Sequence, residues 1–125
     1  MYSDSGINKF QNLHTLKTNF DCMGTVFRFT VSAVENDQVD RIAALIEKAS
    51  ETLREADRIF SLYKPDSPLA RLARGEVSIG DCPPEVAMIW DQCERWEIQT
   101  SGYFSALNPQ RIFDPSGLVK AWAAE

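Results

Sequence analysis

Apolar and polar residues alternate most clearly in the stretch that follows Val26. Apolar side chains occupy every second position and polar ones lie between them: Phe27, Phe29, Val31 and Ala33 against Arg28, Thr30 and Ser32. A period of two is typical of a half-buried β-strand. We expect this strand to begin near Phe20 and to be interrupted at Gly24, by a bulge or by a close approach of the backbone to a ligand.

A helical period follows the strand. The apolar positions are spaced alternately three and four residues apart: Val39, Ile42, Ile46, Ala49, Leu53, Ala56 and Phe60. Asn36 and Asp37 offer an N-cap directly before them. The pattern predicts an amphipathic helix from 39 to 60. A coiled coil is the alternative, but the stripe covers only about three heptads and ends at a proline loop, which favours packing on a sheet.

The second half of the chain alternates between loops and shorter helices. Two prolines in 61–74 end the long helix, a short apolar turn follows through Leu69 and Leu72, and 75–80 has room for an extended piece. Asp81 and Pro84 open a helix that we expect to reach Thr100. Its predicted inward residues are Val86, Ile89, Trp90, Cys93 and Trp96. A turn at 114–117 then opens a last helix, from 118 to 125.

Composition narrows the class of protein. With 125 residues, 44% hydrophobic, the chain predicts one small domain, in which the polar residues 1–19 form a tail. The formal net charge of -5 argues against a nucleic-acid partner, which would require an excess of basic residues. No segment resembles a signal peptide or the ~20 apolar residues of a membrane span, so we expect a cytoplasmic protein with no membrane insertion.

Cysteine and histidine usage excludes several kinds of site. The three cysteines lie far apart and form no CxxC pair, which argues against a zinc site or a disulfide framework. The single histidine, His14, lies in the polar stretch and is interpreted as a solvated residue. With one histidine and no cysteine near it, a Ser-His-Asp or Cys-His hydrolase is disfavoured.

Two short clusters could contact a ligand. Met23-Gly24-Thr25 combines a glycine, which permits close backbone approach, with a flexible apolar side chain; the alternative is a bulged strand start. Tyr63 follows the helix end at Phe60, and Asp66 and Ser67 could fix the next turn. Tyr63 could stack on a planar ring, or it could be a core tyrosine beside a helix cap.

The third cluster is Asp114-Pro-Ser-Gly-Leu-Val-Lys120, at the start of the last predicted helix. A helix N-terminus offers unpaired N–H groups and the positive end of the dipole. Lys120 would lie in the first turn, where a cation is unfavourable unless an anion compensates it. A bound phosphate and a capped surface helix with a solvated lysine are both consistent with this pattern. It is not a Walker P-loop, because the GxxxxG frame is absent.

Taken in order, these clusters resemble the ApbE family, the FAD:protein FMN transferases. The matching segments are MGTVFRF at 23–29, DRIFSLYKPDSPLARLARGE at 57–76, TSGYF at 100–104 and DPSGLVKAWAAE at 114–125. The resemblance covers about residues 20 to 125. It implies an α+β fold, in which an antiparallel sheet packs against helices and the protein holds FAD in a cleft.

The resemblance also implies roles for individual residues. The positions that would contact FAD are Met23, Tyr63, Gly102, Tyr103, Phe104, Asp114 and Lys120. Among these, Met23 and Tyr63 would lie on the flavin, and Asp114 and Lys120 would hold the polar part of the cofactor. Gly117 would offer its backbone carbonyl to Mg²⁺. The residue that acts as catalyst is not assigned.

The implied reaction transfers FMN from FAD to a Thr or Ser hydroxyl of an acceptor protein and releases AMP. Because family members are longer, we expect 20–125 to be the N-terminal portion of such a domain, incomplete at its C-terminus and lacking further magnesium ligands. A non-catalytic FAD-binding module is the first alternative. An interaction protein that uses the helix from 39 to 60 is the second. The sequence indicates no oligomeric state.

Overall fold

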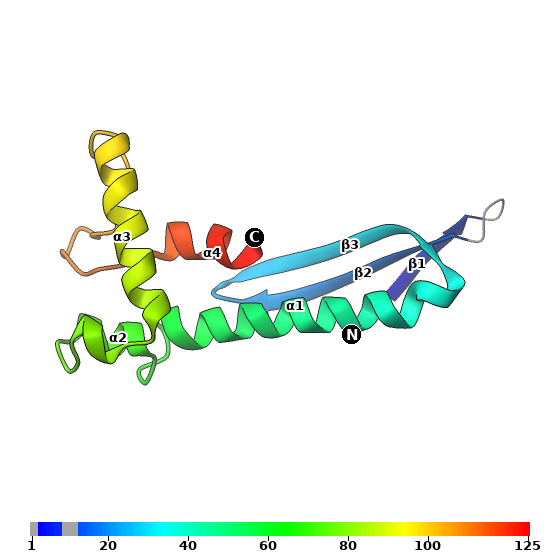
Figure 1. The fold of residues 1–125 in the computed structure, drawn as a ribbon, viewed down its shortest axis with the longest axis horizontal. Helices are drawn as coiled ribbons and strands as arrows, with labels where there is room; N and C mark the ends of the chain where they lie inside the picture. Colours follow the sequence, from blue (N-terminus) through cyan, green and yellow to red (C-terminus); the bar gives the residue numbers. More distant parts are fainter. Residues whose placement is uncertain (1–2, 9–12) are drawn as a thin grey trace. The chain divides into compact units, whose positions relative to one another are not determined.

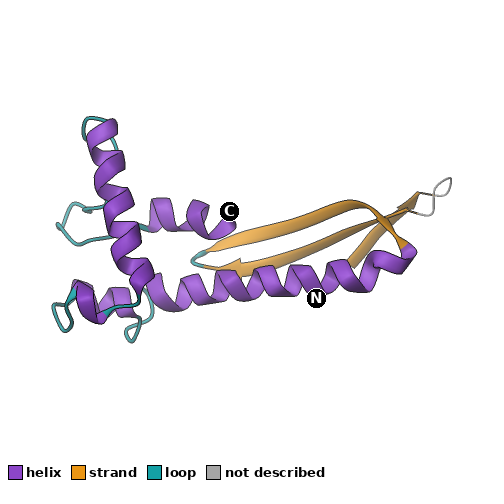
Figure 2. Cartoon of the chain, viewed as in Figure 1, coloured by secondary structure: helices purple, strands orange, loops and turns teal. Residues whose placement is uncertain are grey.

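The structure is a computed structural model that describes residues 3–8 and 13–125. The chain divides into two compact units, Met1–Arg54 and Glu55–Glu125, and each is described by itself. The strands come first along the chain and the helices follow them (Figures 1 and 2), which confirms the predicted α+β class. Within the described residues, no helix is long and apolar enough to cross a membrane.

The first unit contains an antiparallel sheet of three strands. They are β1 (Ser3–Asn8), β2 (Leu13–Cys22) and β3 (Thr25–Glu35), in the order β1-β2-β3 (Figure 1). The predicted tail over 1–19 is therefore wrong for 3–8 and 13–19. The error arose because a polar residue, Thr18, occupies a buried position of β2 between Leu16 and Cys22, which conceals the period.

A two-residue turn, Met23-Gly24, joins β2 to β3. Both residues have positive φ, 53° and 69°. Two successive left-handed residues are the signature of the tight hairpin turn that matches the twist of the flanking strands. The predicted single strand with an interruption at Gly24 is thus a hairpin, and Met23 lies at its tip.

The two faces of the hairpin differ in burial. The register pairs Leu16 with Val31 and Thr18 with Phe29, and Leu16, Thr18 and Cys22 are buried on this face. Lys17, paired with Thr30, is exposed on the opposite face. The sheet is therefore a half-buried one, polar on its outer side.

Helix α1 (Val39–Phe60) follows a short 3-10 turn at Asn36–Gln38. Within the first unit its buried side chains are Ile46, Ser50 and Leu53. The Cys22 thiol donates a hydrogen bond to the Leu53 carbonyl at 3.2 Å, and the Arg54 guanidinium lies 4.7 Å from the centre of the Phe20 ring. The prediction that this helix packs on the sheet is confirmed.

A bulge near the end of β3 changes which residue faces the helix. The register shifts between His14 and Leu16, and Ala33 takes a left-handed φ of 60°. Val34 is consequently buried and Ala33 exposed, the reverse of the predicted alternation. His14 also departs from its prediction: it is a half-buried residue of β2, with Nε2 hydrogen-bonded to the Asn36 side chain.

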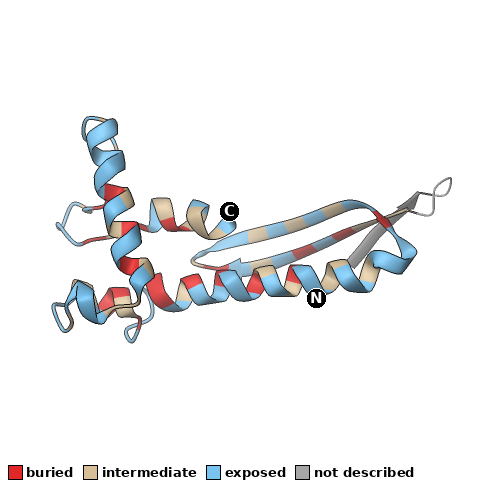
Figure 3. Cartoon of the chain, viewed as in Figure 1, coloured by how far each residue is buried: buried red, intermediate tan, exposed pale blue. Residues whose placement is uncertain are grey.

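The second unit contains the end of α1 and three further helices: α2 (Pro68–Ala73), α3 (Pro84–Gln99) and α4 (Ser116–Ala124). Their buried residues (Figure 3) form its core: Ala56, Ile59, Phe60, Leu69, Ala70, Val86, Ile89, Cys93, Ala106, Phe113 and Val119. The helices predicted over 39–60, 84–100 and 118–125 are confirmed, and α4 starts earlier than expected. Two predictions are wrong here. Trp96 on α3 is 48% exposed, and Ile79–Asp81 is a 3-10 turn.

Candidate functional site

Tyr63 lies on a loop that connects α1 to α2 and is fixed by two serines. The Ser67 hydroxyl donates to the Ser61 carbonyl and accepts from the Ala70 N–H at 3.0 Å. The Ser61 hydroxyl accepts from the Lys64 N–H at 3.2 Å. Between these anchors the Tyr63 side chain is 90% exposed, so the interpretation as a core tyrosine is wrong. The predicted role of Ser67 in fixing the turn is confirmed.

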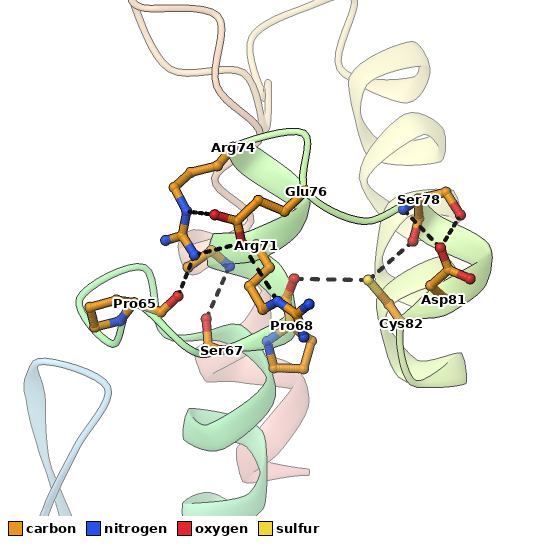
Figure 4. A network of polar contacts seen from close by, with 10 residues as sticks. Pro65, Ser67, Pro68, Arg71, Arg74, Glu76, Ser78, Asp81 and Cys82 are labelled. Atoms are coloured by element: carbon orange, nitrogen blue, oxygen red, sulfur yellow. Dashed lines mark hydrogen bonds and ion pairs between the residues drawn. The ribbon is translucent and has the colours of Figure 1, made fainter.

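A charged pair braces the same loop from its far side (Figure 4). Arg74 donates from Nη2 to the Pro65 carbonyl at 2.7 Å and binds the Glu76 carboxylate through Nε and Nη2, each at 3.0 Å. Gly75, with a φ of 75°, turns the chain so that the two side chains meet. The hydrogen bond from Arg74 lowers the pKa of Glu76. The pair is not among the residues predicted from the sequence, although the Arg-Gly-Glu spacing is a signal for it.

The TSGYF segment reverses the chain after α3. The Thr100 hydroxyl donates to the Trp96 carbonyl at 2.7 Å and accepts from the Phe104 N–H at 2.9 Å. Gly102 takes a φ of 85°, a conformation that other residues adopt at a cost. The turn leaves the Tyr103 ring 97% exposed and directs Phe104 inward to a half-buried position.

Asp114 organises the start of α4. Its Oδ1 accepts a hydrogen bond from the Ser116 N–H at 3.1 Å and another from the Ser116 hydroxyl. This Asx turn begins the helix at Ser116, so Lys120 lies in its second turn. The prediction that Lys120 lies in the first turn is therefore wrong, and its conflict with the dipole is weaker than expected. Lys120 is half-buried and has no ion pair within the described part of the chain.

Two contacts join these segments inside the second unit. A Cβ added to Gly117 would lie 3.9 Å from the ring of Phe104, so the TSGYF segment packs on the first turn of α4. Phe60, three residues before Tyr63, meets Trp122 edge to face with 5.8 Å between ring centres. Three of the four segments that resemble the family, 57–76, 100–104 and 114–125, thus belong to one packed arrangement. Met23, the fourth, lies in the first unit at the β2–β3 turn.

The metal prediction has limited support from the donor chemistry. Gly117, whose carbonyl was predicted to bind Mg²⁺, lies three residues after the Asp114 carboxylate, and one oxygen of that carboxylate already accepts two hydrogen bonds. Among the residues that the structure describes, no group of three or more His, Cys, Asp or Glu side chains could hold a metal ion. Mg²⁺ requires near-octahedral oxygen ligation, so these residues alone do not fit it.

Comparison with known proteins gives one match. A sequence model of the ApbE family matches residues 23–122 of the 125-residue chain, from the hairpin turn to the last turn of α4. No curated protein and no solved structure matches the chain. The match covers all four of the clusters described above. The chain therefore belongs to the ApbE family, a family of flavin transferases that act on acceptor proteins.

Proposed function

We propose that this protein is an FAD:protein FMN transferase, which moves FMN from FAD to a Thr or Ser hydroxyl of an acceptor protein. The observation that supports it most is the packed arrangement in the second unit. There, the loop of Tyr63, the turn of Tyr103 and Phe104 and the start of α4 are joined by the Phe104–Gly117 and Phe60–Trp122 contacts. Each of these segments carries residues that the family resemblance assigns to FAD.

The exposed aromatic residues suit a planar ligand. Tyr63 and Tyr103 are almost fully exposed, on loops that serine, threonine and arginine hydrogen bonds hold in place. A large aromatic side chain in water favours stacking on a flavin or an adenine, since burial of both faces removes apolar surface from water. Gly102 and Phe104 would contribute backbone and ring contacts to the same cofactor.

The polar end of the cofactor is assigned to α4. Lys120 is half-buried with no ion pair in the described residues, so a phosphate oxygen of FAD would give it a partner. Asp114 would contact the cofactor through the carboxylate oxygen that does not accept the Ser116 bonds. Met23, on the hairpin turn of the first unit, is assigned to the flavin by the family resemblance alone.

In the proposed reaction, the acceptor hydroxyl oxygen forms a bond to the FMN phosphorus. The pyrophosphate P–O bond to the adenylate breaks, AMP leaves with its electron pair, and the hydroxyl proton passes to solvent. A cation near the phosphates, here Lys120, stabilises the charge that develops on the leaving oxygen. No residue is assigned as the base. Mg²⁺ is proposed as a requirement of the reaction, but no step is derived through it, because the described donors do not complete its ligand set.

A covalent labelling assay tests the proposal. The purified protein is mixed with FAD, Mg²⁺ and an acceptor known to be labelled by an active flavin transferase, and flavin fluorescence is read on a denaturing gel. We expect a labelled acceptor band that is lost without Mg²⁺, and a decrease of tenfold or more in Lys120→Met. Lys48→Met, an exposed lysine of α1, is the matched control and should label normally. An unlabelled acceptor would overturn the transferase proposal for this chain.

One observation favours a second candidate, a flavin-binding module without transferase activity. The incomplete magnesium donor set would not impair FAD binding through the aromatic loops and Lys120. Gel filtration with FAD separates the two candidates. FAD that co-elutes with the protein in the absence of acceptor labelling supports the module, and loss of co-elution in Tyr63→Ala identifies the site. FAD that elutes free from both the parent protein and Tyr63→Ala, together with an unlabelled acceptor, would exclude both candidates.

A further inference from the structure

A pocket of about 190 Å³ lies between α3 and the 105–113 loop, whose ends adjoin Phe104 and Asp114, two residues assigned to FAD. Its floor is apolar: Trp90 and Phe113 have ring centres 4.6 Å apart, and Cys93 and Ala106 are buried beside them. Leu107 lines one side and is 45% exposed. The isolated bridge between Leu107 and Phe113 closes the 105–113 loop on itself, which fixes the backbone on this side of the pocket.

Two carboxylates lie on the helical side of the pocket. Glu94 and Glu97 both line it, and both are exposed. The Glu94 carboxylate accepts a hydrogen bond from the Trp90 indole N–H at 3.1 Å, which orients it beside the ring. Neither carboxylate has an ion pair within the described residues. The Cys93 thiol, buried at the base, has its pKa raised to about 11 by burial and also by the charge of Glu97.

We propose that this pocket binds an arginine side chain of a partner protein. The aromatic floor suits the alkyl stem and the planar guanidinium, which stacks on aromatic rings. The two carboxylates supply acceptors for a guanidinium, whose N–H groups match a carboxylate in pairs. A lysine ammonium would pair with the carboxylates but would not stack on the rings. A neutral apolar side chain would contact only the apolar floor.

This inference does not depend on flavin transfer. The pocket is lined by α3 and the 105–113 loop, and none of the residues assigned to FAD or to Mg²⁺ lines it. A failed labelling assay would leave the pocket unchanged. The proposed site therefore adds a contact for a protein partner next to, and separate from, the family's own chemistry.

The test uses the full 125-residue chain and three small probes, measured by the shift of the Trp90 indole N–H in an NMR titration. The probes are the N-acetyl methylamides of arginine, lysine and norleucine. The chain has three tryptophans, so Trp96 and Trp122 serve as internal references and Trp90→Phe assigns the peak. We expect saturable binding of the arginine probe with a Kd on the order of millimolar, as befits one side chain.

Charge-removing variants separate the site from long-range electrostatics. Glu97→Gln and Glu94→Gln should each weaken arginine binding about fivefold or more, and the glutamine oxygen of Glu94→Gln can still accept from Trp90. Glu51→Gln, an exposed carboxylate of α1, removes the same unit of charge and should change nothing. Unshifted reference indoles show that each variant is folded.

Several outcomes would overturn the proposal. These are no saturable Trp90 shift, equal affinity for the norleucine or lysine probe, or an equal loss of binding in Glu51→Gln. A Trp90 shift that appears on concentrating the protein alone would also overturn it, since the occupant would then be a second copy of this chain.

Discussion

Different kinds of contact fix the backbone inside each of the two units of this protein. In the first, main-chain ladders between β1, β2 and β3 set the structure, and the residues at irregular φ are few: the Met23-Gly24 turn and the bulge at Ala33. In the second, loops connect short helices, and side chains bind the main chain at each connection, as Ser67, Arg74 and Thr100 do. Backbone polar groups outside ladders require such partners.

This difference explains where the candidate chemistry lies. A ladder fixes side chains on two faces, one buried and one solvated, and leaves little freedom to present a ring outward. Loops anchored at both ends can expose Tyr63 and Tyr103 while the backbone beneath them stays fixed. The second unit therefore carries most of the proposed flavin contacts, and Met23 is the residue of the first unit that the family resemblance assigns to FAD.

Shortening a side chain in the core of the second unit should lower the free energy of unfolding more than the other changes considered. Ile89 on α3 is completely buried, so Ile89→Ala should lower the free energy of unfolding by about 2–5 kcal/mol, through lost burial and the cavity left behind. All tryptophans lie in this unit, so their fluorescence in a urea titration reports on it directly. Ile98→Ala, on the same helix at a position 78% exposed, is the matched control and should change stability little. Equal losses in the two variants would contradict the described core.

Removing a side chain that anchors a loop should lower the free energy of unfolding less than shortening a core side chain does. Ser67→Ala deletes the acceptor for the Ala70 N–H and the donor to the buried Ser61 carbonyl, so we expect a loss of about 1–2 kcal/mol. The same tryptophan titration measures it. Ser101→Ala, an exposed serine of the same unit, is the matched control and should be nearly neutral. A neutral Ser67→Ala would show that the loop is held by other contacts.

The sequence predicted the helices well because their apolar stripes and N-terminal prolines are local signals. The sequence pattern did not predict β2 or the bulge at Ala33, because both depend on pairing between strands. Such pairing joins separate segments and leaves no signal within one of them. At the site, the Asp114 turn and the Ser67 anchor were visible as capping residues. The Arg74–Glu76 brace and the Trp90 pocket were not, since each depends on how loops fold back on a helix. The roles assigned to Met23, Tyr63 and Lys120 at FAD stay predictions of the family resemblance.

The first unit offers a substitution that should stabilise it. Ala33 has a left-handed φ of 60°, which is unfavourable for a residue with a Cβ, so Ala33→Gly should raise the free energy of unfolding by up to about 1 kcal/mol. Hydrogen exchange of the β2 and β3 amides, measured by NMR, follows this unit, which has no tryptophan. Ala44→Gly, exposed on α1, should have the opposite sign and about the same size. Destabilisation by both variants would mean that the bulge does not hold Ala33 in this conformation.

The smallest expected effect is the pH dependence of the Arg74–Glu76 brace. The hydrogen bond from Arg74 holds the pKa of Glu76 below its ordinary value of 4.5. A carboxylate whose pKa is lower in the folded state stabilises the protein above the unfolded pKa, and this contribution is lost as pH falls through the folded pKa. Both groups are exposed, so the contribution is small and is screened by salt.

Glu76→Gln should therefore unfold at a slightly lower temperature than the parent protein near neutral pH, and the gap should close below about pH 4. Tryptophan fluorescence during thermal unfolding measures the gap, since the brace lies in the second unit. Asp91→Asn, which changes an exposed carboxylate of α3 in the same unit, is the matched control. If the gap widened in acid, Glu76 would stabilise the folded protein more when protonated than when ionised. That result would contradict the contact with Arg74. A gap of the expected sign would show that the loop of Tyr63 is held by charge as well as by Ser67, unlike the ladders of the first unit.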